Sequence, residues 1–281
     1  TRNGQALTTS YSAEAMRAYF DGEFSRLLEA ADAFVDTPTG GWDMQVRGLR
    51  ACLRVLRGEP VPGDRPVPGQ RTADRPGGVA GQRSRPPVDD ITDALAAARG
   101  GGFHRPHWTT LGMAALCRAL QGRSEEAAAL LDELADSWSA VPALASGEWI
   151  AAAAYAASLV GRDSAVRVRG MLDQVGHRTP WAEAALRTVT AAVAAADGDH
   201  SRAGELHLAA ADIYARIPDT TDRMLALALA AGELGRSPGN PLAAQALAEV
   251  RGFALRNQAP GLLRLGQLGE AASGWSPELA S

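Results

Sequence analysis

The chain of 281 residues has a formal net charge of −4, with 28 basic residues, all of them arginine, against 32 acidic ones. This balance excludes the concentrated positive field that nucleic-acid binding requires, so we expect no direct contact with DNA or RNA. Hydrophobic residues make up 46% of the chain and aromatic residues only 5%, which favours a core of Ala, Leu and Val packed between helices. No apolar run approaches the ~20 residues of a membrane span, and no signal peptide is recognisable, so we expect a cytoplasmic protein that does not enter a membrane.

Apolar residues recur at helical spacing along most of the chain, in pairs of segments separated by a short Gly or Asp-Gly break. Glycine accepts the left-handed backbone conformation that ends a helix, so each break predicts a tight reversal between two antiparallel helices. The predicted pairs are 11–20 with 23–36, 42–57 with 89–99, 106–120 with 124–138, 142–160 with 164–175, 180–196 with 201–217, and 221–234 with 241–257, followed by a capping helix over 260–272.

A single amphipathic pair cannot bury its own apolar stripe, so the pairs are expected to stack into an all-α, right-handed superhelix, or solenoid. The stretch 58–88 interrupts the pattern with Pro, Gly, Arg and Gln, and it has almost no large apolar side chain to offset the entropy of ordering it. We therefore predict helical repeats over 1–57, a disordered insertion over 58–88, the main solenoid over 89–272 and a flexible tail over 273–281.

One acidic motif has the spacing of a site for Mg²⁺ and a diphosphate. Asp89, Asp90 and Asp93 form a DDxxD sequence, which places carboxylates on one face of a helix. The same residues also suit a helix start, where Asp89 or Asp90 caps the first turn. We favour the cap because the chain has no second metal motif and few aromatic residues to line an isoprenoid cavity.

Two histidines, His104 and His107, stand three residues apart and could in principle share a metal ion. No cysteine or compact acidic group lies nearby in the sequence to complete four ligands, so we favour a helix that begins at Pro106 and carries the histidines on its surface or at a repeat interface. Ser, His and Asp residues occur elsewhere without a nucleophile elbow. We therefore expect no catalysis, no metal and no cofactor.

Tryptophans fall in or at the start of the first helices of the predicted pairs. First helices of stacked pairs line the concave surface on which extended peptides lie, and Trp and Arg are common anchors of such interfaces. For any one of these residues, packing between repeats or a solvated charge is the simpler interpretation. The candidate binding residues are Trp42, Arg47, Arg50, Trp108, Trp149, Trp181 and Arg187.

Four stretches of the sequence carry a family resemblance: YFDGEFSRLLEAADAFV, LQGRSEEAAALLDELADSW, RTPWAEAALRTVTAAVAAADGDHSRAGELHLAAADIYARIPD and ALAEVRGFALRNQAPGLLR. The third of them begins with RTPW, contains a GD turn and ends with IPD, in that order. They resemble the tetratricopeptide-like region on the C-terminal side of large bacterial ATP-binding regulators, of the LuxR type and the related cyclase type. In that family the nucleotide and the DNA bind to separate domains. This chain has no GxxxxGK[ST] motif and no basic recognition helix, so the resemblance implies a regulatory scaffold and neither of those activities.

We therefore expect a non-catalytic scaffold, the partner-docking or inducer-sensing segment of a cytosolic transcriptional or signalling regulator. Its partner would be a protein or peptide on the concave face, or an ATPase or output domain of the same protein outside this sequence, which begins at Thr1 rather than at a methionine. One alternative is a small-molecule receptor that encloses an inducer in an apolar cavity around Trp108, Trp149 and Trp181. A more remote alternative is a Mg²⁺-dependent enzyme of the isoprenoid type that uses the DDxxD motif at 89–93.

Overall fold

All regular secondary structure in the described part of the chain is helical. The computed structural model describes residues 2–35, 43–59, 90–100, 104–138, 149–175 and 178–271, and these ranges hold thirteen helices and no strand. The predicted all-α class is confirmed. The predicted insertion, apart from Gly58 and Glu59, and the predicted tail over 273–281 lie outside the described residues.

The helices begin and end close to the positions that the apolar periodicity predicts, with exceptions at α1, which begins at Arg2, and at α7, before which residues 142–148 lie outside the described ranges. In chain order they are α1 (Arg2–Asp21), α2 (Phe24–Val35), α3 (Asp43–Leu56), α4 (Asp90–Gly100), α5 (His104–Leu120), α6 (Ser124–Ser137), α7 (Trp149–Val160), α8 (Arg162–Asp173), α9 (Pro180–Ala196), α10 (His200–Arg216), α11 (Thr220–Leu234), α12 (Pro241–Asn257) and α13 (Pro260–Ala271). Within the described ranges, none of them combines the length and the apolar character that crossing a bilayer requires.

The reversals between paired helices use glycine as predicted. Gly22, Gly122 and Gly198 have φ angles of 74°, 75° and 89°, in the left-handed region that a residue with a Cβ atom rarely adopts. After each glycine the chain turns back within a few residues, so that α1 packs on α2, α5 on α6 and α9 on α10.

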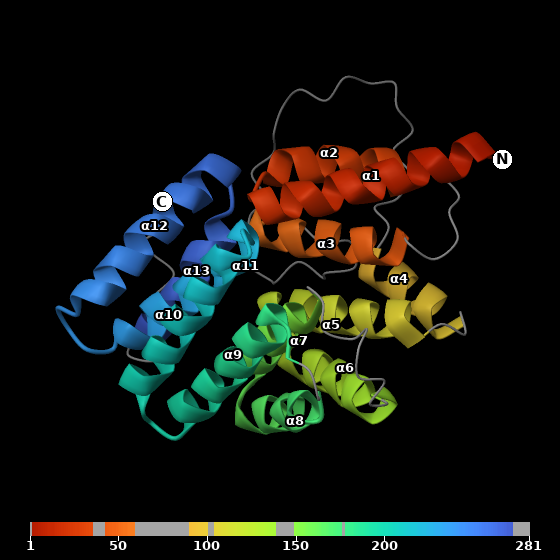
Figure 1. Ribbon diagram of the computed structural model, residues 1–281. Helices are drawn as coiled ribbons and strands as arrows, with labels where there is room; N and C mark the ends of the chain where they lie inside the picture. The colour runs from red at the N-terminus through yellow and green to blue at the C-terminus, as the bar shows by residue number, and fades with distance from the viewer. Residues whose placement is uncertain are drawn as a thin grey trace, which may run out of the picture.

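The middle of the molecule has the neighbour relations expected of stacked pairs. Helix α3 packs against α5, α5 against α7 and α7 against α9, while α3 also packs on α4, α5 on α6 and α7 on α8 (Figure 1). The contact of α3 with α4 agrees with the prediction that residues 89–99 complete the pair begun by 42–57.

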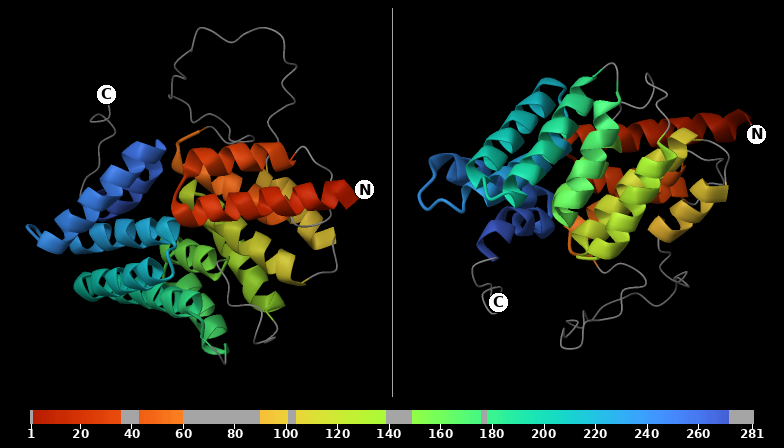
Figure 2. Two further views of the ribbon diagram at one scale, coloured as in Figure 1. Left: turned by 45° about the horizontal axis from the view of Figure 1, so that its top comes forward. Right: turned by 90° about the horizontal axis from the view of Figure 1, so that it is seen from below.

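The two ends of this arrangement meet. Helix α11 packs against α10, α12 and α13 and also contacts α1, while α13 contacts α3, so the N-terminal group of helices lies beside the C-terminal group (Figures 1 and 2). The apolar pattern of the sequence did not predict this contact, because the pattern reports which face of a helix is buried and not which helix covers it.

Hydrogen bonds at the start of α11 hold the ends together. The Tyr19 hydroxyl on α1 donates to Asp222 Oδ1 at 2.8 Å, and the Tyr155 hydroxyl on α7 donates to the backbone carbonyl of Asp222 at 2.7 Å. The Thr221 hydroxyl donates to the backbone carbonyl of Tyr19. Asp222 is fully buried, and burial raises the pKa of Tyr19 and of Tyr155 well above the ordinary tyrosine value, so both phenols keep their protons and donate.

A second contact joins the start of α2 to the end of α12. The backbone N–H of Phe24 donates to Asn257 Oδ1 at 3.0 Å, and Arg57 Nε donates to the Asn257 carbonyl at 3.1 Å. The rings of Phe24 and Phe253 meet edge to face, with their centroids 5.4 Å apart. Five helices, α1, α2, α7, α11 and α12, are thus tied together by polar and aromatic contacts between residues far apart in the sequence.

We expect the Tyr19→Phe variant to lose about 1–3 kcal/mol of unfolding free energy, because it removes a buried hydrogen bond to a carboxyl group. Tyr214→Phe is the matched control, since the Tyr214 hydroxyl is buried in the same region and lies near the Tyr155 hydroxyl, but makes no hydrogen bond to a carboxylate among the described residues. Urea denaturation followed by circular dichroism measures both variants. Equal stability of the Tyr19 and Tyr214 variants would contradict the role given to the contact between α1 and α11.

His207 on α10 makes stability depend on pH. The residue is 2% exposed, and burial lowers its pKa from 6.5 to about 3. Between these two pH values the unfolded chain binds a proton at His207 that the folded chain does not bind. The free energy of unfolding therefore falls as the pH drops from 6.5 towards 3, by up to about 1.4 kcal/mol per pH unit. Denaturation curves at pH 7 and pH 5 are expected to differ less for His207→Leu than for the wild type. The same loss in both proteins would show that His207 does not cause it.

Candidate functional site

The predicted tryptophan anchors are engaged within the protein wherever the structure describes them. Trp108 is buried, its Nε1 donates to the Ser137 carbonyl at 3.2 Å, and its ring lies 5.1 Å from that of Trp138. Trp181 Nε1 donates to Asp219 Oδ2 at 3.1 Å. These rings have separate partners and do not form one continuous surface. Of the other two, Trp42 lies outside the described residues and Trp149 begins α7.

The predicted arginine anchors form ion pairs. Arg50 is 7% exposed and binds Asp90 with two nitrogens, one of them Nε at 2.8 Å, while its Nη1 donates to Asp32 Oδ1 at 2.7 Å. Burial opposes the charge of Arg50, but the hydrogen bonds with these carboxylates raise its pKa. Arg47 Nη1 lies 3.9 Å from Asp90 Oδ1. Arg187 Nη2 donates to Glu183 Oε1 at 2.9 Å.

The acidic motif does not present its described carboxylates to one point. Asp90, the first residue of α4, is 5% exposed and turned toward Arg50 on α3, whereas Asp93 is exposed. Asp89 lies outside the described residues. His104 begins α5, and His107 Nε2 lies 3.8 Å from Glu133 Oε1. Over the described ranges, no group of three or more His, Cys, Asp or Glu side chains could hold a metal ion.

Asp90→Asn is expected to destabilise the fold by about 3–5 kcal/mol, because it leaves the buried Arg50 guanidinium without its main counter-charge. Asp93→Asn, three residues further along the same motif, removes an exposed carboxylate and is expected to change stability by less than about 0.5 kcal/mol. Thermal unfolding of the two variants measures the difference. A similar effect of both changes would argue against the buried ion pair as the purpose of the motif.

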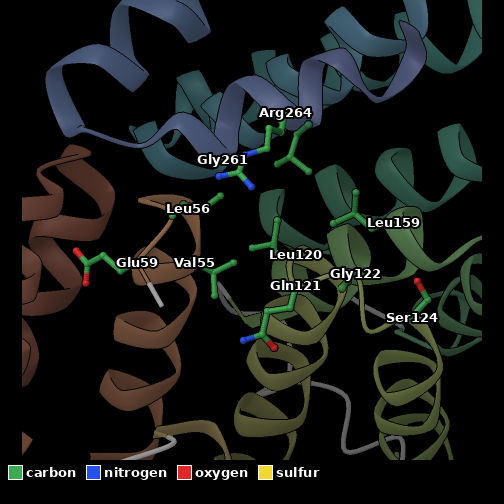
Figure 3. A pocket seen from close by; sticks show the side chains of 13 residues that line it. Val55, Leu56, Glu59, Leu120, Gln121, Gly122, Ser124, Leu159, Gly261 and Arg264 are labelled. Carbon is green, nitrogen blue, oxygen red and sulfur yellow. The ribbon is translucent and has the colours of Figure 1, made fainter. Parts of the chain in front are cut away.

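One cavity among the described residues lies where three helices end. Helices α3, α5 and α7 finish side by side at Leu56, Leu120 and Val160, and α13 crosses their ends (Figure 3). The space between them, which is partly open to solvent, is about 640 Å³. Its apolar wall is formed by Val55, Leu56, Ala119, Leu120, Leu159 and Leu265.

Two hydrogen-bond donors line this cavity without an acceptor among the described residues, one on the half-buried Gln121 and one on the exposed Arg264. The Gln121 amide oxygen accepts from Arg118 Nη1 at 3.1 Å, but its buried Nε2 has no hydrogen-bond partner in the described part of the chain. Arg264 reaches down from α13 toward the helix ends (Figure 3), and no ion pair joins it to another described residue. The C-terminal ends of three helices carry partial negative charge, which favours a cation such as Arg264 at this place. Glu59 and Ser124 add two further polar groups to the wall.

Gly261 sets the distance between α13 and the helix ends. A Cβ atom at this position would lie 2.7 Å from the carbonyl oxygen and 2.9 Å from the Cα atom of Leu56, closer than such atoms approach in proteins. Because both are backbone atoms of α3, they could not move aside without shifting the helix. The position of α13 therefore depends on the absence of a side chain at Gly261. The shape of the cavity depends on it too.

Sequence reasoning missed Gln121, Gly261 and Arg264. The sequence predicts a capping helix over 260–272 for the stretch that includes Gly261 and Arg264, and the structure has a helix there, α13 (Pro260–Ala271). The only local signal was the Pro-Gly pair at the start of that helix, which marks a close approach but does not name the surface approached.

No family model, curated protein or solved structure matches this chain. The resemblance to the tetratricopeptide-like region of bacterial regulators therefore stays a prediction.

Proposed function

We propose that the chain is a non-catalytic ligand sensor, the inducer-sensing form of the scaffold expected from its sequence, and that the cavity under α13 is its ligand site. The observation that carries the proposal is the cavity of about 640 Å³ between α13 and the ends of α3, α5 and α7. This volume lies within the range of small-molecule sites, which is roughly 300–1,000 Å³. The predicted right-handed superhelix of tetratricopeptide-like pairs is part of the same proposal.

A partner peptide on the inner faces of the helices is the weaker candidate. The sides of α1, α7 and α11 that face one another are occupied by Tyr19, Tyr155 and Asp222, all of them buried. An extended peptide would have to displace this hydrogen-bonded cluster. A small molecule under α13 would displace no described side chain, so the cavity favours the inducer over the docked peptide.

The walls define the class of ligand. Six apolar side chains offer surface for an apolar body, while Gln121 Nε2 and the Arg264 guanidinium offer donors that lack an acceptor among the described residues. A molecule with a hydrophobic body and neutral carbonyl groups would offer acceptors to these donors, whereas the partial negative charge of the three helix ends and the Glu59 carboxylate disfavour a full anion. Charge-assisted hydrogen bonds from arginine to such a group are stronger than neutral ones.

The position of the cavity supports a way in which a bound ligand would change the structure. A ligand there would touch α3, α5 and α7 on one side and α13 on the other, and so would bias the contact between the first and last helices of the stack. A change in that contact would alter the surface offered to the expected ATPase or output domain of a cytoplasmic regulator. Differential affinity of the ligand for the two arrangements is what would make such a change possible.

Nile red is a suitable probe, because it combines an apolar aromatic body with a neutral carbonyl group. We expect one dye per chain to bind with a rise in fluorescence. Leu120→Trp, which fills the cavity, is expected to abolish this binding, and Arg264→Gln to weaken it about tenfold through the loss of a charge-assisted hydrogen bond.

Leu255→Gln is the matched control for the dye experiment, since Leu255 on α12 is 71% exposed and is the most exposed large apolar side chain among the described residues. Its removal should leave the fluorescence unchanged. Unchanged dye binding by Leu120→Trp, or loss of binding by Leu255→Gln, would place the dye on the outer surface and contradict the proposal. Circular dichroism of each variant separates loss of the site from loss of the fold.

A further inference from the structure

We propose that a second cavity, between the start of α9 and the end of α10, binds the phosphate group of a small phosphorylated molecule. The cavity holds about 350 Å³, and its wall includes Arg178, Arg187 and Arg216 with a single carboxylate, that of Glu183. This inference is independent of the sensor site under α13, with which the cavity shares no lining residue.

The positive charge of this cavity is only partly neutralised. Arg178 Nη2 lies 3.3 Å from Asp173 Oδ1, and Arg187 Nη2 donates to Glu183 Oε1 at 2.9 Å. Arg216 forms no ion pair with any residue in the described ranges. Arg187 Nε is buried and has no hydrogen-bond partner there. A buried donor without an acceptor costs free energy, and an anion in the cavity would supply the acceptor.

The start of α9 adds positive potential but few backbone donors. Pro180, the first residue of the helix, has no N–H group, and the Thr179 hydroxyl already accepts from the backbone N–H of Ala182 at 3.4 Å. The helix dipole still places partial positive charge at this end. The arginine side chains must therefore provide most of the hydrogen bonds to a bound anion.

The number of guanidinium groups favours phosphate over carboxylate. A carboxylate has two oxygens and is satisfied by one arginine fork, whereas a phosphate group offers three or more acceptor oxygens in different directions. Arg178 precedes α9, Arg187 lies two turns along it and Arg216 ends α10, so the three groups come from different points of the wall. Ile213 and Ile217 supply an apolar surface for the molecule that carries the phosphate.

Inorganic diphosphate without Mg²⁺ is the probe, titrated calorimetrically at an ionic strength held constant with chloride. We expect saturable binding by the wild type and a loss of about tenfold or more in affinity for Arg216→Gln, with a similar loss for Arg187→Gln. Arg202→Gln is the matched control, because Arg202 lies at the opposite end of α10 with Glu205 as its ion-pair partner at 3.4 Å. It removes the same charge and is expected to leave the affinity unchanged.

Absence of saturable binding heat from the wild type would overturn the proposal. An equal loss of diphosphate affinity in Arg216→Gln and Arg202→Gln would also overturn it, because it would indicate a general effect of net charge. Should Arg187→Gln fail to fold, Arg178→Gln tests the same wall. Leu120→Trp should still bind diphosphate, so failure of the sensor site and failure of this site are distinguishable. Binding that requires Mg²⁺ and is lost in Asp93→Asn would instead assign the diphosphate to the acidic motif.

Discussion

The start of α11 is the point on which the rest of the structure depends. Polar groups removed from water must find partners inside the protein, and here the partners come from helices far away in the sequence. Asp222 receives hydrogen bonds from Tyr19 on α1 and Tyr155 on α7, and Asp219, which caps α11, receives one from Trp181 on α9. An acidic pair that looks in the sequence like an ordinary helix start thus ties four helices together.

The cavity under α13 is a consequence of this closure. Helix α11 packs against α1 and is joined to α7 by the Tyr155 hydrogen bond, and after α12 the chain returns as α13, which contacts α3 and crosses the ends of α3, α5 and α7 (Figure 3). Gly261 permits backbone contact at one edge, while the side chains of Leu265 and Arg264 keep the rest of α13 away from the helix ends.

The two proposed functions, ligand sensing and anion binding, would make different demands on the same protein. The first cavity lies between helices from the two ends of the chain, so its occupant couples them, whereas the second lies within the α9 and α10 pair. A phosphorylated ligand in the second cavity would reinforce one pair without touching the closure. The two proposed sites would therefore allow two ligands to act on the same set of helices separately.

The sequence by itself determined the all-α class, most helix limits, the glycine reversals and the pairing of α3 with α4, because periodicity, turn chemistry and helix starts are local properties. It did not determine that Arg50 and Asp90 form a buried ion pair, that Trp108 and Trp181 donate hydrogen bonds to residues outside their own helices, or that Gln121 and Arg264 line the same cavity. Those facts were decided by the tertiary structure. Amphipathic helices rich in alanine can cover one another in many combinations, and only the completed set of buried hydrogen bonds and close backbone contacts selects one of them.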